Sequence, residues 1–303
     1  MGFMLKTYAE IFARVQLRPH RKRISVAMAD DPSVLAALKD VEQKGIAESI
    51  LIGNPTRIQA LAEELHFPVS ENQIVPAVED QEIAALAVEQ IRKGRADILM
   101  KGHIATPILM KAVLDRDKGL RKGDVLSHVA VAEIPTYPKF LIMGDGGINI
   151  TPDLEAKKAI LNNMLQVGQK LQIACPKVAV LCPIEKVNPK IPETIDAAEL
   201  QKLADAGQFG NIILEGPIAM DVALSAEAAA KKGIKSAIAG QTDVLLVPNI
   251  TCGNALIKIL MCLTESRVGG LVVGATVPII LLSRSDNPEE KFDSILLAIL
   301  IAD

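Results

Sequence analysis

Aromatic residues are scarce in this sequence. Phe, Trp and Tyr make up 3% of the 303 residues, and there is no Trp, whereas 50% of the chain is hydrophobic. The core must therefore consist of Ala, Val, Ile and Leu, the composition of a parallel sheet that helices cover on both faces. Half of the residues are hydrophobic and only 23% are charged, so the chain can bury a large core, and an intrinsically disordered chain is excluded. The length allows two domains.

An excess of charge of either sign is also lacking. Lys and Arg total 33 and Asp and Glu total 36, which gives a net charge of −3. This balance predicts no nucleic-acid or membrane partner, although a local basic site remains open. The longest uncharged apolar stretch, between Arg267 and Arg284, is too short to cross a bilayer. The N-terminus fits neither a signal peptide nor a lipid anchor, since Lys6 and Glu10 interrupt its apolar pattern. We expect a cytoplasmic protein.

Metal-type cysteine clusters and the common nucleotide motifs are missing. The four cysteines, at positions 175, 182, 252 and 262, form no CxxC pair, so we expect reduced thiols. The chain contains no GxGxxG, GxxxxGK[ST], HExxH or GxSxG sequence, which weakens dehydrogenase, P-loop, zinc-protease and esterase interpretations. Aspartates are not clustered as divalent-metal ligands. We expect no metal and no bound cofactor.

Short β-branched runs alternate with segments of helical spacing, which predicts an α/β fold with βαβ units. The predicted strands are 24–27, 49–52, 98–100, 177–181, 212–214, 244–247 and 271–273. A short polar residue followed by Pro, as a helix cap and first helical residue, precedes five helical segments. These pairs are Asp31-Pro32, Asn54-Pro55, Thr106-Pro107, Thr151-Pro152 and Asn287-Pro288. They mark the carboxyl ends of strands, where ligands bind in open α/β sheets.

The sheet pattern is interrupted at Gly144-Asp145-Gly146-Gly147, and composition shifts again near Val268. Such a glycine cluster suits a domain crossing or a close backbone approach to a ligand. We therefore predict a first domain from 1–143 and 270–303 and a second domain from 144–269.

The strongest candidate site follows the last apolar strand. Ser283 and Arg284 come at its end, and Asn287-Pro288 opens the final helix. An arginine beside a helix N-terminus makes a phosphate site, and a surface arginine paired with Asp286 or Glu289 is the alternative. Glu290 fits a capping box with Asn287 better than it fits a base.

Four other polar loops are candidates, each with a purely structural alternative. Lys101 and Thr106 flank a Gly102-His103 turn after a strand, where a surface lysine is the alternative. Arg121 and Lys122 supply positive charge ahead of Ser127-His128, although a lone histidine is usually structural. Glu215-Gly216-Pro217 resembles a tight exposed turn. The last loop, 247–254, holds Asn249, Gly253 and Asn254.

Together these loops resemble the phosphate acetyl/butyryltransferase family, and the butyryl branch most closely, from about Lys101 to the C-terminus. The matching stretches are 126–131 (LSHVAV), 133–135 (EIP), 149–154 (NITPDL), 185–192 (EKVNPKIP), 194–198 (TIDAA), 216–217 (GP), Asp221, 245–248 (LLVP), 253–254 (GN) and 283–284 (SR). So many matches in the right order are far more specific than any one of them.

The resemblance implies reversible transfer of an acyl group between coenzyme A and phosphate, without a covalent enzyme intermediate. It implies a two-domain fold like that of the isocitrate and isopropylmalate dehydrogenases, with an interdomain cleft, and a homodimer. The predicted catalytic residues are Arg284 for phosphate, Ser283 for the carbonyl or thiolate, and His128 as a further donor. The predicted substrate-binding residues are Lys101, Thr106, Lys111, Arg121, Ser127, Asp145, Asn149, Gly216, Pro217, Gly253 and Asn254.

Some positions depart from the family pattern. Lys111 stands where relatives often carry Arg, Glu215 and Asn249 stand where Asp is usual, and Glu290 occupies the spacing of a proposed thiol base. Three alternatives therefore stay open: a phosphate acetyltransferase, a non-catalytic protein that binds coenzyme A or acyl phosphate, and a metal- and NAD-dependent decarboxylating dehydrogenase. The absence of an aspartate cluster weakens the dehydrogenase alternative.

Overall fold

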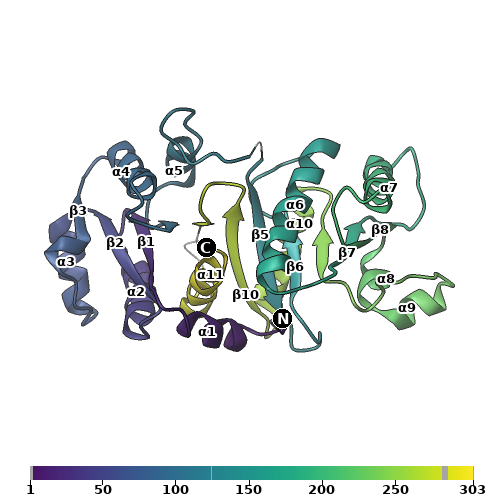
Figure 1. The fold of residues 1–303 in the computed structure, drawn as a ribbon, viewed down its shortest axis with the longest axis horizontal. Helices are drawn as coiled ribbons and strands as arrows, with labels where there is room; N and C mark the ends of the chain where they lie inside the picture. Colours follow the sequence, from purple (N-terminus) through teal and green to yellow (C-terminus); the bar gives the residue numbers. More distant parts are fainter. Residues whose placement is uncertain (1–2, 124, 282–285, 303) are drawn as a thin grey trace. The chain divides into compact units, whose positions relative to one another are not determined.

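The computed structural model describes residues 3–123, 125–281 and 286–302, which form two compact units (Figure 1). The terminal unit comprises Tyr8–Asp124 and Gly269–Asp303, and the middle unit comprises Met1–Thr7 and Val125–Val268. Both units are mixed α/β structures, as the alternating pattern predicted.

In the terminal unit, the strands follow the order β3-β2-β1-β4-β11-β10. They are β1 (Lys22–Ala27), β2 (Ala47–Gly53), β3 (Ile74–Pro76), β4 (Ile98–Lys101), β10 (Arg267–Val273, from Gly269 on in this unit) and β11 (Ile279–Ile280). The first five in that order are parallel, and β11 pairs antiparallel with β10. The carboxyl ends of β1, β4 and β11 therefore lie at one edge.

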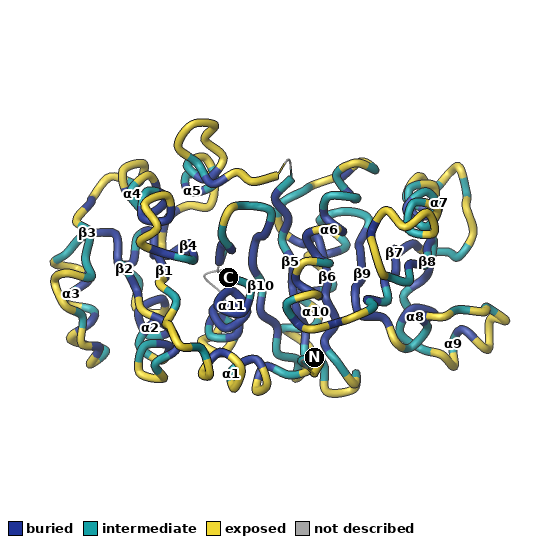
Figure 2. The backbone as a smooth tube through the Cα atoms, viewed as in Figure 1, coloured by how far each residue is buried: buried dark blue, intermediate teal, exposed yellow. Residues whose placement is uncertain are grey.

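The helices of the terminal unit are α1 (Tyr8–Gln16), α2 (Pro32–Gln43), α3 (Pro55–Glu64), α4 (Asp80–Arg92), α5 (Thr106–Val113), α11 (Pro288–Ile301) and the 3-10 turn η1 (Glu71–Gln73). α11 packs against α1 and α2, and α4 packs against α5. Apolar side chains make α11 the best-buried helix here, with Ile295 to Ile299 fully covered, and Figure 2 shows it in dark blue.

In the middle unit, the strand order is β5-β6-β9-β7-β8. They are β5 (Ser127–Glu133), β6 (Leu141–Gly144), β7 (Lys177–Leu181), β8 (Ile213–Ile218) and β9 (Val244–Leu246), with α6 (Leu154–Lys170), α7 (Pro192–Asp205), α8 (Met220–Leu224), α9 (Ala226–Lys231) and α10 (Ile250–Leu263). β5 runs antiparallel to β6 and the other pairs are parallel. The amino end of β5 therefore meets the carboxyl ends of β6 and β9.

The boundaries of these units differ from the predicted domain limits. The sequence grouped 125–143 with the N-terminal half, whereas contacts group it with the middle of the chain. The reason is strand pairing, since β5 bonds to β6 and β6 bonds to β9. The domain limits 1–143, 144–269 and 270–303 stay a prediction about independently folding parts.

Three of the five predicted caps are confirmed. The side chains of Asp31, Asn54 and Asn287 accept backbone N–H groups at the starts of α2, α3 and α11. The other two are wrong: Thr106 is the first residue of α5, after Ala105, and α6 is capped by Asp153, two residues beyond Thr151. Asp153 takes over because its carboxylate accepts the Ala156 N–H at 2.8 Å.

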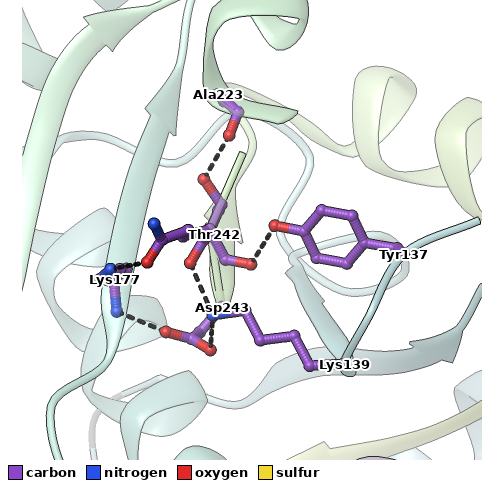
Figure 3. A network of polar contacts seen from close by, with 7 residues as sticks. Tyr137, Lys139, Lys177, Ala223, Thr242 and Asp243 are labelled. Atoms are coloured by element: carbon purple, nitrogen blue, oxygen red, sulfur yellow. Dashed lines mark hydrogen bonds and ion pairs between the residues drawn. The ribbon is translucent and has the colours of Figure 1, made fainter. Parts of the chain in front are cut away.

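A network of hydrogen bonds and an ion pair connects the amino ends of strands β7 and β9 in the middle unit (Figure 3). The buried Asp243, just before β9, accepts the Lys177 backbone N–H at 2.8 Å and the Lys139 ammonium at 2.5 Å. Tyr137 donates to the Thr242 carbonyl at 2.8 Å, and burial beside the Asp243 charge raises the pKa of that phenol. The network lies at the strand ends opposite to those where α/β proteins bind ligands, so its role is structural. Among the described residues, no helix has the length and apolar character to cross a membrane.

Candidate active site

In the terminal unit, the loop after β4 is held tightly against the loop after β1. The Gly102 N–H donates to the Ala27 carbonyl at 2.8 Å, and the His103 N–H donates to the Met28 carbonyl at 2.9 Å. A Cβ on Gly102 would lie 2.0 Å from the Met28 carbonyl oxygen, which no side chain tolerates. The two loops thus form a rigid surface at the carboxyl edge of this sheet.

This edge carries positive charge. Lys101 is 6% exposed at the end of β4, and its ammonium donates to the Gly102 carbonyl at 3.2 Å. Thr106 begins α5, and Lys111 lies exposed in its last turn. No described side chain caps α5. Pro107 carries no N–H group, and the Ile108 N–H donates to the Ala105 carbonyl at 3.0 Å, so the start of this helix offers few backbone donors to an anion. Arg121 is exposed and bridges to Ala275.

Asp31 and His103 meet at the same edge, although the sequence pattern marked Asp31 only as a cap and His103 only as part of a loop. Asp31 Oδ1 accepts the Ser33 and Val34 N–H groups at 2.9 and 3.0 Å. Its Oδ2 lies 3.4 Å from His103 Nδ1. Burial raises the pKa of Asp31, but hydrogen bonds from Ser33, Val34 and His103 outweigh it, so the pKa falls below its ordinary value. The carboxylate is therefore ionised at neutral pH.

Two predicted catalytic residues, Ser283 and Arg284, lie outside the described residues. The strand that precedes them, β11, runs parallel to β4, with Ile280 beside Met100. The predicted capping box after them is confirmed: Asn287 Oδ1 accepts the Glu290 N–H at 2.9 Å, and Glu290 Oε2 accepts the Asn287 N–H at 2.8 Å. The Glu290 carboxylate is thus bonded to the helix end.

In the middle unit, Asp145 organises the loop after β6. It is 2% exposed, and its Oδ1 accepts the Gly147 and Ile148 N–H groups at 2.7 and 3.0 Å. Its Oδ2 accepts the Asn149 backbone and side-chain N–H groups at 3.1 and 2.6 Å. Asn149 also donates to the Leu126 carbonyl at 2.8 Å, which ties this loop to the start of β5.

The start of α10 packs onto the same loop. A Cβ on Gly253 would lie 2.4 Å from the Asp145 carbonyl oxygen, so only glycine fits there. Asn254 donates to the Gly146 carbonyl at 3.2 Å. The predicted residues Asp145, Asn149, Gly253 and Asn254, although far apart in sequence, therefore form one cluster.

His128 and Ser127 border this cluster at the amino end of β5. A Cβ on Gly147 would lie 3.3 Å from the His128 Cβ and Cγ atoms, so the ring lies against the glycine loop. Ser127 is fully buried, and its hydroxyl accepts the Asn163 amide N–H at 2.9 Å. The structure thus gives Ser127 a packing role, whereas His128 is half-buried beside the cluster.

Gly216 and Pro217 differ from the predicted exposed turn, because both lie within β8. Gly216 is buried, and a Cβ there would meet Val180 at 2.8 Å. Its N–H donates to Gln201 Oε1 at 3.0 Å, and the bond to Pro217 is cis. The Glu215 carboxylate accepts the Ala237 N–H at 2.6 Å. The pairing of β8 with β7 continues to Ile218, beyond Gly216 and Pro217. This pairing with a distant strand could not be inferred from the local sequence.

Two of the four thiols, Cys182 and Cys252, are poor nucleophiles in this setting. Burial raises the pKa of Cys182 to about 12 and also raises the pKa of Cys252, so both are protonated at neutral pH. Within the described part of the chain, no group of three or more His, Cys, Asp or Glu residues could hold a metal ion.

Both clusters present polar or cationic side chains. In the terminal unit these are Lys101, Thr106 and Arg121, with the Asp31 carboxylate at the same edge. In the middle unit they are His128 and Asn254, because Asp145 accepts the N–H groups of the glycine loop. Such groups bind phosphate and stabilise an oxyanion that develops during acyl transfer.

Comparisons with known proteins agree with this chemistry. The protein family described as phosphate acetyl/butaryl transferase matches residues 7–88 and 69–299. A phosphate butyryltransferase from Clostridium acetobutylicum is 40% identical over 299 residues, which is 99% of each chain. A phosphate acetyltransferase from Thermotoga maritima is 40% identical over 93% of this chain and 95% of its own. The crystal structure of a branched-chain phosphotransacylase from Enterococcus faecalis superposes with a TM-score of 0.81 at 33% identity, over 93% of this chain and 99% of that one.

Proposed function

Because the chain belongs to the phosphate acetyl/butaryl transferase family, we propose that it transfers a short acyl group reversibly between coenzyme A and phosphate. The observation that carries this function is the 40% identity to a phosphate butyryltransferase along 99% of both chains. The cationic and polar side chains of the two clusters, among them Lys101, Arg121 and His128, support it, because both substrates are anionic and the reacting carbonyl becomes negative.

The transfer is direct within one ternary complex. The thiol of coenzyme A attacks the acyl phosphate carbonyl, and phosphate leaves, or the reverse occurs. Raised thiol pKa values at Cys182 and Cys252 support this route, since neither is an activated nucleophile. The enzyme gains rate by holding the two substrates in position and by stabilising the oxyanion.

Residue roles follow the predicted assignments. Arg284 holds the phosphate through its planar fork, and Ser283 donates to the carbonyl or the thiolate. Lys101, Thr106, Lys111 and Arg121 supply charge and donors from the terminal unit. His128, Asn149, Gly253 and Asn254 contribute from the cluster that Asp145 holds together, and Ser127 packs beside it at the start of β5. Gly216 and Pro217, on β8, keep their predicted role in substrate binding.

Butyryl groups are the preferred substrate. The relative that matches 99% of the chain is a butyryltransferase, whereas the acetyltransferase match covers 93%. Their identity is the same, 40%, so acetyl transfer remains the second candidate. Pocket selection for one or two methylenes yields only about 1–3 kcal/mol, so overlap between acyl chains is expected.

The architecture is that of the isocitrate and isopropylmalate dehydrogenases, with a cleft between two domains. The protein acts in the cytoplasm as a homodimer, without a metal or bound cofactor. Exposed apolar side chains on α10, Ile259 at 49% and Leu263 at 78%, support self-association.

The test is release of coenzyme A from acetyl-, butyryl- and isobutyryl-CoA, with and without phosphate. Phosphate-dependent release that is fastest with butyryl-CoA is expected. In the same assay, Arg284→Ala raises the KM for phosphate and lowers kcat, and Arg284→Lys restores part of the rate, because lysine lacks the bidentate fork. Release that ignores phosphate, or wild-type kinetics in Arg284→Ala, contradicts the proposal.

A further inference from the structure

The reaction needs a group that removes the proton from the thiol of coenzyme A. Glu290 stands six residues after Arg284, at the spacing of the proposed base, but its carboxylate caps helix α11. Glu290 Oε2 accepts the Asn287 N–H at 2.8 Å within the capping box. This bond stabilises the start of α11 and holds the carboxylate at the helix end. Another proton acceptor at the carboxyl edge of the terminal unit would be better placed for the reaction.

Asp31 and His103 form such an acceptor. His103 Nδ1 lies 3.4 Å from Asp31 Oδ2, while Asp31 Oδ1 is occupied by the N–H groups of α2. The carboxylate favours the tautomer with its proton on Nδ1, which leaves the lone pair on Nε2. The His103 side chain is 51% exposed, so that lone pair can reach a ligand. A base oriented by a carboxylate is the arrangement that activates nucleophiles in many enzymes.

The backbone fixes this pair in advance. The His103 N–H donates to the Met28 carbonyl at 2.9 Å. Gly102 also packs so closely against Met28 that no side chain fits between the two loops. Asp31 is held in turn by the Ser33 hydroxyl at 2.6 Å. Preorganised groups of this kind lose little freedom on binding substrate.

The pair lies at the carboxyl edge of the terminal sheet, where α/β proteins bind ligands. His103 follows β4, which is a parallel neighbour of β1 and of β11, with Met100 between Val26 and Ile280. Two further charged groups lie close to the pair in sequence: Lys101, and Asp30, whose carboxylate is paired with Arg57 at 3.1 Å. The negative charge of Asp30 is thus balanced, and Asp31 is the carboxylate that faces the imidazole.

We propose that His103 is the general base for the thiol of coenzyme A and that Asp31 is its positioning residue. This inference rests on the proposed acyl transfer. Nε2 of His103 takes the proton from the thiol S–H, and the sulfur forms a bond to the acyl carbon. The bond from that carbon to the phosphate oxygen then breaks, and the phosphate keeps the electron pair. In the reverse direction, His103 returns the same proton to the departing thiolate.

The experiment measures kcat/KM for coenzyme A with butyryl phosphate between pH 6.5 and 9.5, for the wild type and His103→Gln. A lost base lowers the rate about 10²–10⁴-fold at pH 7. The deficit shrinks at least tenfold by pH 9.5, because a free thiol ionises near pH 8.5 without help. Imidazole added to His103→Ala restores part of the rate. His20→Gln, which changes an exposed histidine before β1, is the matched control and keeps wild-type rates.

Asp31→Asn tests the positioning role, since asparagine still caps α2 but cannot orient the imidazole as a carboxylate does. It retains the wild-type melting temperature and loses rate mainly at low pH. A His103→Gln enzyme with at least one third of wild-type activity at pH 7 overturns the inference. The inference is also overturned if His103→Gln lowers kcat/KM by the same factor at every pH. It is likewise overturned if His128→Gln, and not His103→Gln, shows the loss of rate that shrinks as the pH rises. A wild-type protein without any acyl transfer overturns the proposed function itself, which keeps the two failures distinct.

Discussion

Asp145→Asn removes one carboxylate oxygen from the centre of the middle cluster. The wild-type side chain is 2% exposed and accepts four hydrogen bonds, two at each oxygen. Asparagine keeps one oxygen, so its amide N–H₂ must face either the Gly147 and Ile148 N–H groups or the two N–H groups of Asn149. Two part-buried donors then lose their acceptor in either orientation.

The size of the effect follows from that count. A fully buried donor left without an acceptor costs about 1–3 kcal/mol. Because these donors are only part-buried, water can reach them, and we expect two of them to lower the free energy of unfolding by about 1–2 kcal/mol. The loop also carries Asn149, which spans to the Leu126 carbonyl, so its displacement disturbs the surroundings of His128. We expect kcat to fall at least tenfold.

Urea unfolding, followed by circular dichroism, measures the change in the free energy of unfolding. The release of coenzyme A from butyryl-CoA measures kcat. Asp153→Asn is the matched control, since Asp153 is an exposed cap of α6 and asparagine caps equally well. An Asp145→Asn protein whose unfolding free energy lies within about 0.5 kcal/mol of the wild type refutes the assignment of those four bonds.

Four further outcomes are expected. Gly102→Ala places a Cβ 2.0 Å from the Met28 carbonyl oxygen and destabilises the protein by at least about 1–3 kcal/mol in urea unfolding, and an unchanged midpoint contradicts the close contact. Glu290→Gln keeps a capping acceptor and retains activity within about tenfold, whereas a several-hundredfold loss of kcat at constant melting temperature makes it the base. Cys252→Ser keeps substantial activity, and an acyl group trapped on Cys252 in the wild type refutes direct transfer. Chelation by EDTA leaves the rate unchanged, and a loss that Mg²⁺ or Mn²⁺ reverses contradicts a metal-free reaction.

The elements with local signals could be predicted from the sequence. Strand β7 coincides with its predicted run at 177–181, and the caps Asp31 and Asn54 are where the Pro signal put them. Composition also marked 144–147 as a special loop, and that loop proves to be the centre of the middle cluster. Periodicity and capping are properties of a few neighbouring residues, which is why they are readable.

Sequence and structure differ where the interacting residues are distant in sequence. Gly216-Pro217 reads locally as a turn, but pairing with β7 keeps it in a strand. The predicted domain limits place 125–143 with the N-terminal half, whereas strand pairing links β5 to β6 and β6 to β9, and no local pattern signals those pairings. The domain limits themselves stay a prediction. The meeting of Asp31 with His103 depends on β1 and β4 being neighbours, and no spacing rule connects those two residues.

Product identification tests the central claim most directly. Purified protein is incubated with butyryl-CoA and inorganic phosphate, free coenzyme A is titrated, and butyryl phosphate is measured by phosphorus NMR. The account predicts that the two products form in equal amounts, that neither forms without phosphate, and that added coenzyme A drives the reaction back. Release of coenzyme A without butyryl phosphate would mean hydrolysis, and no release from any acyl-CoA would mean a binding protein; either result contradicts a phosphate acyltransferase.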